Sequence, residues 1–364
     1  MLSCGIVGLP MTGKTTLFNL LTERKEDTSK FFSGKTKTNK GVAKIPDKRV
    51  DVLIDQYKPK KETYATLEVV DIAGLVKGSS SGAGVGNSFI EDIRFSDALI
   101  HVVRAFNNED IPHADDTINP MRDIETVNLE LLFADLEFVE KRISRIESSK
   151  KVTPEQKDEL EVLKYLAQEL EDEKPFYQIS LSDEQFEIIK PYRFLTNIPM
   201  IIVVNIDDEQ LESNDYLQKS EISEYAKDKD IALIEISLQT EIEISELDDD
   251  TQKEFLLELG IDEPGVNIVA RTMYNVLDQI SFFTVGEDEV RAWTIQNGLN
   301  AQQAAGKIHS DLERGFIRAE TVSYDDFATA NYSMNKSKDL GLWRLEGKTY
   351  IVKDGDILNI RFNV

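Results

Sequence analysis

The sequence has little cysteine and no long apolar run. Cys4 is the only cysteine among 364 residues, which rules out an intramolecular disulfide and favours a reducing compartment. No stretch approaches the roughly 18 uninterrupted apolar residues of a membrane-spanning helix, and no charged leader with a following apolar segment opens the chain. We therefore expect a soluble, cytoplasmic protein with no membrane partner.

Basic residues are also scarce relative to acidic ones. The 42 lysines and arginines are outnumbered by 67 aspartates and glutamates, so the net charge is −25 and the surface as a whole repels nucleic-acid phosphates. Sequence-specific DNA binding is not expected, and contact with RNA requires a local basic patch. A candidate patch contains one acid, Asp47, and its basic residues are Lys30, Lys35, Lys37, Lys40, Lys44, Lys48 and Arg49, followed by KPKK at Lys58–Lys61. This patch is compatible with contacts to ribosomal RNA and with a merely solvated loop.

The chain does contain short, continuous apolar runs separated by helical stretches. CGIVGL, ATLEVVDIAGL, DALIHVVRAF, IPMIIVVNI and DIALIEISL have the length and composition of strands buried on both faces. Their alternation with helices predicts an α/β fold with a mostly parallel sheet. We assign residues 1–123 and 195–278 to this discontinuous domain.

The interval between the third and fourth runs is longer than a crossover needs, which predicts an inserted element. Apolar residues recur at helical spacing over 124–143 and again over 160–170, and Thr153 and Pro154 mark the start of the second helix. Two amphipathic helices joined by a turn predict an antiparallel hairpin within residues 124–194. This hairpin is either a solvated helical pair without chemistry or an arm that binds a partner.

The pattern changes again near Gln279. β-rich runs separated by Gly and Asp turns follow, as in LEGKTYIVKDGDILNIRFNV, and predict a small mixed sheet over residues 279–364 that folds separately. No internal repeat or low-complexity linker is evident, and we expect a monomer.

The stretch GLPMTGKTT lies between the first apolar run and a helical stretch. Gly8, Gly13, Lys14 and Thr15 satisfy the pattern G-x-x-x-x-G-K-[ST] in the strand–loop–helix context that it requires. In such a loop the backbone amides and the helix N-terminus face a phosphate, the lysine neutralises the β and γ oxygens, and the hydroxyl ligates Mg²⁺. The predicted nucleotide contacts here are Leu9, Pro10, Met11, Thr12, Gly13, Lys14, Thr15 and Thr16.

A second motif, VVDIAG, ends in Asp-x-x-Gly. Asp71 can hold Mg²⁺ through water, and the amide of Gly74 can meet a γ-phosphate. After a phosphate loop, this motif indicates the second switch of a GTPase-like domain. We therefore predict Mg²⁺ as the cofactor, with Thr15 and Asp71 as its residues, and we include Lys14 and Gly74 among the catalytic residues.

Longer blocks closely resemble the YchF family of Obg-like ATPases, namely DIAGLVKGSSSGAGVGNSFIEDIRFSDALIHVVRAF, VRAWTIQNGLNAQQAAGKIHSDLERGFIRAE and GDILNIRFNV. The likeness extends from the first residues to the last. It implies a P-loop nucleotide domain interrupted by a helical hairpin, a carboxyl-terminal TGS domain of the ubiquitin-like kind, and ATP hydrolysis coupled to the translation machinery.

Two phosphate-side motifs depart from the family pattern. Met11 and Thr12 replace an Asn-Val pair, and a thioether cannot ligate a hard cation, so we expect potassium to have little effect on the rate. In the first switch, Lys35 falls where the family has the threonine that contacts Mg²⁺. Thr36 or Thr38 can take that place after a small slip, and the sequence does not choose between them.

The base-reading motif departs as well. The chain has Asn205, Ile206, Asp207 and Asp208 where the family has Asn-x-x-Glu and GTPases have Asn-Lys-x-Asp. We predict nucleotide contacts at Asn205, Ile206, Asp208 and Ser237, with Asn205 orienting the base and its loop and Ser237 making a backbone contact to the base. Asp208 supplies the carboxylate that guanine requires, but Ile206 replaces the lysine that covers the ring. We therefore expect ATP to bind at least as well as GTP.

Leu75 follows Asp-x-x-Gly where many GTPases have a water-positioning glutamine, and an aliphatic side chain cannot orient water. Of the three histidines, His113 matches the histidine to which the resembled family assigns this role, and it is our predicted catalytic residue. Two function classes follow: a slow ATPase switch with GTP as an alternative substrate, or a nucleotide-sensing, ribosome-docking module that has lost hydrolysis. A GTPase is a further alternative. The intact Lys14, Thr15 and Asp71 favour the enzyme.

Overall fold

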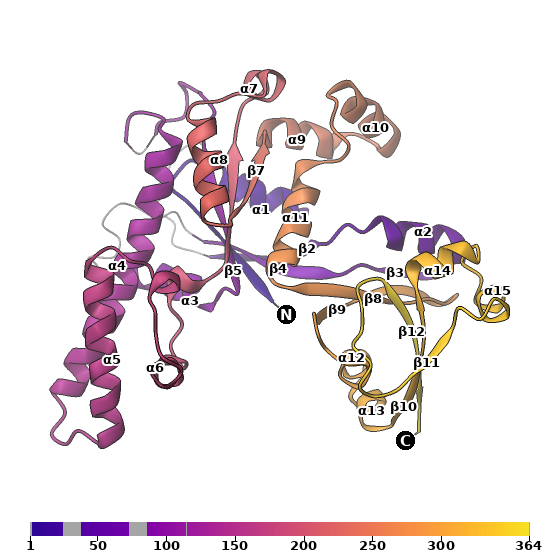
Figure 1. Cartoon of the computed structure of the whole chain (residues 1–364). Helices are drawn as coiled ribbons and strands as arrows, with labels where there is room; N and C mark the ends of the chain where they lie inside the picture. The colour runs from indigo at the N-terminus through magenta and orange to yellow at the C-terminus, as the bar shows by residue number, and fades with distance from the viewer. Residues whose placement is uncertain (1, 25–37, 73–85, 114, 364) are drawn as a thin grey trace. The chain divides into compact units, whose positions relative to one another are not determined.

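The computed structural model describes residues 2–24, 38–72, 86–113 and 115–363 (Figure 1). The chain divides into two compact units, one of Met1–Gly41 with Glu68–Val269 and one of Val42–Leu67 with Ala270–Val364. Within these ranges the strands form two six-stranded sheets. No helix in the described ranges is long and apolar enough to span a bilayer.

The first sheet is mostly parallel, as predicted. Its strands are β1 (Ser3–Val7), β2 (Asn39–Lys44), β4 (Thr66–Asp71), β5 (Ala98–Arg104), β6 (Met200–Asn205) and β7 (Ala232–Ile236), in the spatial order β2-β4-β1-β5-β6-β7. The neighbours from β4 to β7 all pair in parallel. The continuous apolar runs are explained by this arrangement, because a parallel sheet is covered by helices on both faces.

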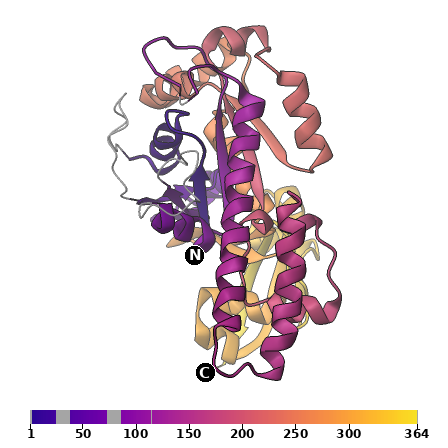
Figure 2. The ribbon, with the colours of Figure 1, turned by 90° about the vertical axis from the view of Figure 1, so that its left-hand side faces the viewer.

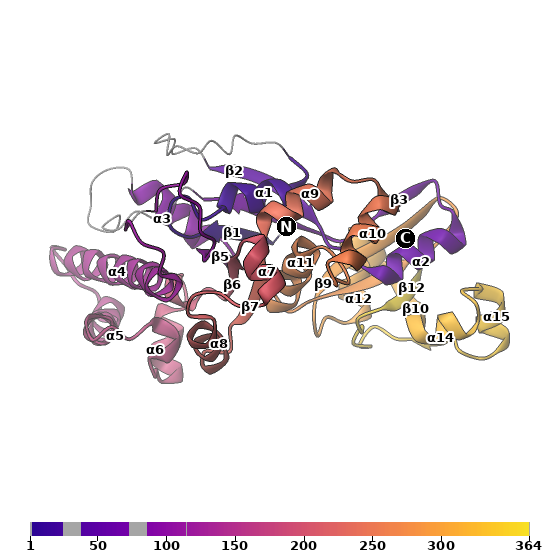
Figure 3. The same cartoon turned by 90° about the horizontal axis from the view of Figure 1, so that it is seen from above.

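Helices cover both faces of this sheet (Figure 3), with α1 and α9 on one side and α4 and α8 on the other. The helices of the unit outside the hairpin are α1 (Lys14–Thr22), α3 (Gly86–Phe95), α7 (Asp208–Ser213), α8 (Lys219–Asp228), α9 (Leu238–Glu246), α10 (Asp249–Glu258) and the start of α11 (Gly265–Val276). On the α4 side, Val127 and Leu131 pack against Val7, Val70 and Leu99 of the sheet.

The predicted antiparallel hairpin is present (Figure 2). It consists of α4 (Pro120–Glu147) and α5 (Pro154–Glu171), and the short helices η2 (Phe176–Gln178), α6 (Asp183–Ile189) and η3 (Leu195–Asn197) lead back to β6. A capping box between Thr153 and Gln156 starts α5 at the predicted place. Arg142 Nε pairs with Glu159 Oε1 at 2.7 Å across the two helices, and an apolar seam from Leu132 to Leu170 lies between them.

A buried carboxylate fixes the chain where it returns to the sheet. Asp135 on α4 accepts hydrogen bonds from the amides of Leu195 (2.8 Å) and Thr196 (2.9 Å) and from the Thr196 hydroxyl (2.9 Å). Burial raises the pKa of Asp135 to about 6, although these donors and Arg94 oppose the shift. Asp135 therefore anchors the base of the hairpin to the segment that precedes β6.

The second sheet is mixed, as predicted. Its strands are β3 (Lys61–Thr63), β8 (Gln279–Thr284), β9 (Glu289–Gln296), β10 (Phe316–Ser323), β11 (Arg344–Glu346) and β12 (Asp356–Phe362), in the order β11-β10-β12-β8-β9-β3. β3 pairs in parallel with β9, and β8 pairs antiparallel with β9. The helices of this unit are α2 (Lys48–Tyr57), α12 (Ala301–Ile308), α13 (Ser310–Arg314), α14 (Tyr324–Thr329) and α15 (Met334–Asp339).

The compact units divide the chain differently from the predicted domain boundaries: residues 42–67 and 270–278 lie with the carboxyl-terminal unit, and the hairpin lies in the same unit as the first sheet. Val42–Leu67 lies with the carboxyl-terminal unit, although it precedes the second switch in the sequence. The cause is the parallel pairing of β3 with β9, reinforced by Arg49, which pairs with Asp354 at 2.7 Å. Neither contact leaves a local signal in the sequence, because the partners are more than two hundred residues apart.

Candidate nucleotide site

The loop between β1 and α1 has the backbone of a phosphate-binding loop. Gly8 and Gly13 have φ values of 146° and 103°, in the region that favours glycine. A Cβ on Gly8 would lie 2.4 Å from the Val102 carbonyl oxygen, and one on Gly13 would lie 2.7 Å from Asn205 Nδ2. Both glycines are therefore required by close approach as well as by conformation. Gly13 precedes α1, and no side chain caps the start of this helix.

Lys14 lies within this loop and is held by it. Lys14 is 8% exposed, and its Nζ donates to the Leu9 carbonyl oxygen at 2.6 Å. The same carbonyl oxygen accepts a hydrogen bond from the Thr12 hydroxyl at 3.1 Å. Burial lowers the pKa of Lys14 to about 8, with Asp71 acting in the opposite direction. A lysine in this state gains from an anion placed beside it, because the anion compensates for its lost solvation.

Thr15, in the first turn of α1, and Asp71, at the end of β4, come together. The Thr15 hydroxyl donates to Asp71 Oδ2 at 2.9 Å, and Asp71 pairs with Ile6 in the β1–β4 register. A hydroxyl and a carboxylate are ligands suited to Mg²⁺, which takes few protein ligands when phosphates and water supply the rest. No group of three or more metal-ligating side chains occurs among the described residues. The pair therefore fits Mg²⁺ bound together with a nucleotide.

The predicted switch residues are only partly described. Gly74, Leu75, Lys35 and Thr36 lie outside the described residues. Thr38 is described, and its hydroxyl donates to Asp92 Oδ2 on α3. Of the two proposed substitutes for the switch threonine, Thr38 is thus engaged with a protein carboxylate.

Asn205 joins the phosphate loop to the base end of the site. Its Nδ2 donates to the Thr12 carbonyl oxygen at 3.0 Å, and its Oδ1 accepts from the Leu238 amide at 3.2 Å. The residue is 6% exposed, so both contacts are shielded from water. Asn205 therefore connects the phosphate loop to the start of α9.

The remaining base-end residues occupy different environments. Asp208 is exposed, and its Oδ1 accepts from the Ser237 hydroxyl at 2.8 Å and the Thr240 hydroxyl at 2.6 Å. Ile206 is only 4% exposed, packs in the core with Val204 and Tyr216, and donates its amide to Ile236. The structure therefore brings Asn205, Asp208 and Ser237 together, and it places the side chain of Ile206 away from them in the core.

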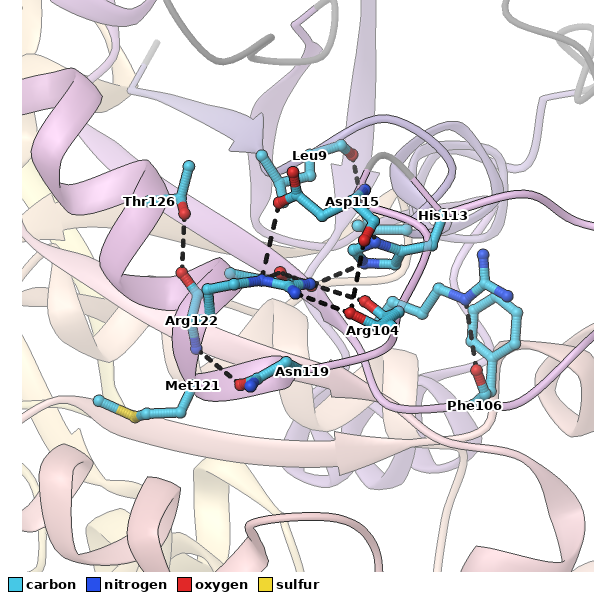
Figure 4. A network of polar contacts seen from close by, with 12 residues as sticks. Leu9, Arg104, Phe106, His113, Asp115, Asn119, Met121, Arg122 and Thr126 are labelled. Carbon is cyan, nitrogen blue, oxygen red and sulfur yellow. Dashed lines mark hydrogen bonds and ion pairs between the residues drawn. The ribbon is translucent and has the colours of Figure 1, made fainter.

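His113 lies in the loop between β5 and α4, as expected, but its ring is buried. The side chain is 4% exposed, and Nε2 lies 2.8 Å from Asp123 Oδ2. Nδ1 accepts a hydrogen bond from the Asp115 amide at 3.1 Å. Because Nδ1 is the acceptor, Nε2 carries the proton and donates it to Asp123. Both ring nitrogens are thus engaged within the protein, in the network that Figure 4 shows.

Arg104 organises this loop and was not singled out from the sequence. It is 1% exposed at the end of β5. Its guanidinium donates to the carbonyl oxygen of Phe106 (Figure 4) and to those of Asn108, Ile111 and Pro112. A buried cation needs such partners. The signal was available, because an arginine that ends an otherwise apolar strand is unusual.

His101 lies inside the same strand, opposite Val7 of β1. Burial and the nearby Lys14 lower the pKa of His101 to about 3, so the ring is neutral. Its Nδ1 has no hydrogen-bond partner among the described residues.

Four of the seven described basic residues of the patch pair with acids. Lys40 lies 3.7 Å from Glu68, and Arg49 binds Asp47 and Asp354. Further along, Lys60 and Lys61 pair with Asp288 and Glu289, and their side chains are 80% and 66% exposed. Exposed pairs of this kind are weak and exchange readily for other anions.

The fold and the loop define a P-loop nucleotide-binding protein with an appended carboxyl-terminal domain. The sequence model of the 50S ribosome-binding GTPases matches residues 3–134, and that of the YchF-GTPase carboxyl-terminal domain, described as a protein of unknown function, matches residues 279–363.

Full-length relatives identify the family. The chain is 44% identical over 362 residues to the ribosome-binding ATPase YchF of Haemophilus influenzae, covering 99% of each chain, and 43% identical over 367 residues to that of Bacillus subtilis, covering all of each. The solved structure of the Schizosaccharomyces pombe YchF GTPase superposes with a TM-score of 0.82 at 33% identity, over 99% of this chain and 97% of that one. The chain belongs to the YchF family.

Proposed function

We propose that this protein is a ribosome-associated ATPase that binds ATP with Mg²⁺, hydrolyses it slowly, and accepts GTP as an alternative substrate. The observation that carries the proposal is the convergence of Lys14, Thr15 and Asp71 at the end of β1. The relatives from H. influenzae and B. subtilis are named ribosome-binding ATPases, which supports the same activity here.

The phosphate end of the site does the binding. The backbone amides of residues 11–16 and the N-terminus of α1 receive the phosphate oxygens, while Lys14 exchanges the Leu9 carbonyl for the β and γ oxygens. Thr15 and Asp71 would hold Mg²⁺, and the Gly74 amide is the predicted contact to the γ-phosphate. When bound, the metal would help to neutralise the charge of the phosphate oxygens.

The hydrolytic step requires a group that orients water, and we assign it to His113. With its Nε2 proton held by Asp123, the ring can offer only the lone pair of Nδ1 to a water molecule. The Asp115 amide occupies that lone pair at 3.1 Å. On this proposal His113 acts only after the Asp115 contact is exchanged for water, and this exchange makes turnover slow.

A hydrolysis-deficient nucleotide sensor is the second candidate. It is favoured by the double engagement of His113, and by Met11 in place of a cation-ligating residue. Turnover of ATP and of GTP by the purified protein, with and without ribosomes, decides between the two. Hydrolysis in any combination supports the enzyme, and zero turnover with normal nucleotide binding supports the sensor.

The other parts are assigned to docking. We propose that the helical hairpin is an inserted arm over residues 124–194 and that residues 279–364 form a TGS domain. We also propose that the basic patch contacts ribosomal RNA, with phosphates replacing the exposed acidic partners of its lysines and arginine. The protein is proposed to act as a cytoplasmic monomer. Ribosome co-sedimentation at rising salt tests the patch, because binding through lysine–phosphate contacts weakens steeply with salt.

A further inference from the structure

The loop that carries His113 is held by two arginines that differ in exposure. Arg104 binds the carbonyl oxygens of Asn108 and Ile111, upstream of the histidine, and is buried. Arg122, in the first turn of α4, binds the loop downstream of the histidine (Figure 4), and its side chain is 31% exposed. The downstream half of the loop is therefore held by a group that other molecules can reach.

The contacts of Arg122 lie on both sides of the His113 ring. Its Nη2 donates to Asp123 Oδ1 at 2.9 Å, and the other oxygen of Asp123 engages Nε2 of the ring. Its guanidinium also donates to the Thr117 carbonyl oxygen at 2.7 Å and to the Thr117 hydroxyl at 2.9 Å. It lies 3.6 Å from the carboxylate of Asp115, the residue whose amide occupies Nδ1. Arg122 therefore contacts both residues that engage the ring.

The two sides of the ring depend on Arg122 to different degrees. Asp123 is fixed within α4, where its amide donates to the Asn119 carbonyl oxygen at 3.0 Å and the helix N-terminus stabilises its charge. Among the described residues, the polar contacts that tie residues 115–117 to α4 are those of Arg122. Asp116 has φ 58°, a left-handed conformation that costs free energy in a residue other than glycine. Loss of Arg122 therefore loosens the Nδ1 contact and keeps the Nε2 contact.

We propose that Arg122 is a latch that keeps the Asp115 amide on Nδ1 of His113 and thereby restrains hydrolysis. This inference rests on the proposed function, in which His113 orients the attacking water. When the guanidinium releases residues 115–117, the Asp115 amide withdraws and Nδ1 accepts a hydrogen bond from water, while Asp123 keeps the ring in the same tautomer. Because the guanidinium is partly exposed, an anionic group of a partner can compete for it and open the latch.

The test removes the latch and leaves the ring in place. Arg122→Met keeps a long side chain but has no donor. It should raise the rate of single-turnover ATP hydrolysis by roughly tenfold, because a charge-assisted contact to the loop is lost. The nucleotide Kd should not change, since Arg122 has no polar contact with any predicted nucleotide residue that the structure describes. Exchange of the Asp115 amide proton with deuterium, followed by NMR, should become faster in the variant.

Two further variants separate the latch from a general loosening of the site. Arg122→Met combined with His113→Ala should hydrolyse ATP as slowly as His113→Ala alone, because the latch acts only through the ring. Arg145→Met is the matched control and should keep the wild-type rate, since Arg145 is an exposed arginine on the same helix.

Melting curves show whether each variant is folded. If Arg122→Met does not fold, Thr117→Val carries the test, because it removes one acceptor of the guanidinium at an exposed residue. Thr117→Val should raise the rate of hydrolysis by about twofold.

The outcomes are distinct. A faster rate in folded Arg122→Met, with an unchanged Kd and no gain once His113 is replaced, supports the latch. An equal or slower rate overturns it, as does a gain that persists without the histidine. A rate that depends on His113 but not on Arg122 overturns the latch alone. If neither the wild type nor Arg122→Met hydrolyses bound ATP, the proposed function is overturned and the latch with it.

Discussion

The phosphate loop and the His113 loop lie in the same unit, but their functional groups are in opposite states. In the phosphate loop, Lys14 is bound to a backbone carbonyl that a phosphate can replace, and no side chain caps the start of α1. In the His113 loop, Asp123 and Asp115 engage both ring nitrogens of His113, and Arg104 binds carbonyl oxygens of the loop. The contrast indicates that the site is formed for binding, whereas hydrolysis requires a rearrangement.

The largest effect is expected from replacing His113, which tests whether hydrolysis depends on this loop. His113→Ala should lower kcat by roughly a hundredfold and leave the nucleotide Kd nearly unchanged, because a water-orienting group acts mainly in the transition state. Single-turnover hydrolysis of ATP without ribosomes measures the effect.

A matched control exists for this variant. His309 also accepts the amide of the second residue after it on Nδ1, at 3.1 Å, but its side chain is 64% exposed and lies in the other unit. His309→Ala should keep the wild-type rate. If His113→Ala hydrolysed ATP at the wild-type rate, another group would have to orient the attacking water.

The next prediction concerns the affinity for the nucleotide. Lys14→Ala should weaken triphosphate affinity by about one to two decades, since a charge-assisted contact of about 1.5–3 kcal/mol is lost, while the fold persists. Calorimetric titration measures the Kd. Lys164→Ala is the control, because Lys164 is 56% exposed on the hairpin and pairs only with Glu147 among the described residues. An unchanged Kd for Lys14→Ala would contradict the assignment of this loop as the phosphate-binding loop.

The pH dependence of binding sharpens the role of Lys14. Its pKa in the nucleotide-free protein is about 8, lowered by burial. Below that pH the ammonium is charged and ready to pair with phosphate, and above it binding must take up a proton. ATP affinity should therefore fall as pH rises above 8, by up to about tenfold per unit. Titration in buffers of different ionisation enthalpy measures the proton uptake, and Lys14→Ala should show neither effect.

The smallest expected effect concerns potassium. Replacing potassium by sodium should change the wild-type rate less than about twofold, because the thioether of Met11 does not ligate a hard cation. Met11 has φ 63°, a left-handed conformation that asparagine adopts readily. Met11→Asn should therefore keep the loop and introduce potassium stimulation. A large potassium effect in the wild type would contradict this prediction.

The sequence by itself determined the features that depend on neighbouring residues. The strand–loop–helix around Lys14, the capped start of α5 at Thr153, and the apolar strands of the first sheet follow from local spacing, capping and burial, which act over a few residues.

Only the tertiary structure decided which partners the polar groups find. Asp123 on α4 engages His113, Thr240 on α9 engages Asp208, and β9 draws β3 into the second sheet. Each of these contacts joins segments brought together by packing. A buried polar group takes whichever partner the packing brings within reach, so its environment depends on the whole fold rather than on its own motif.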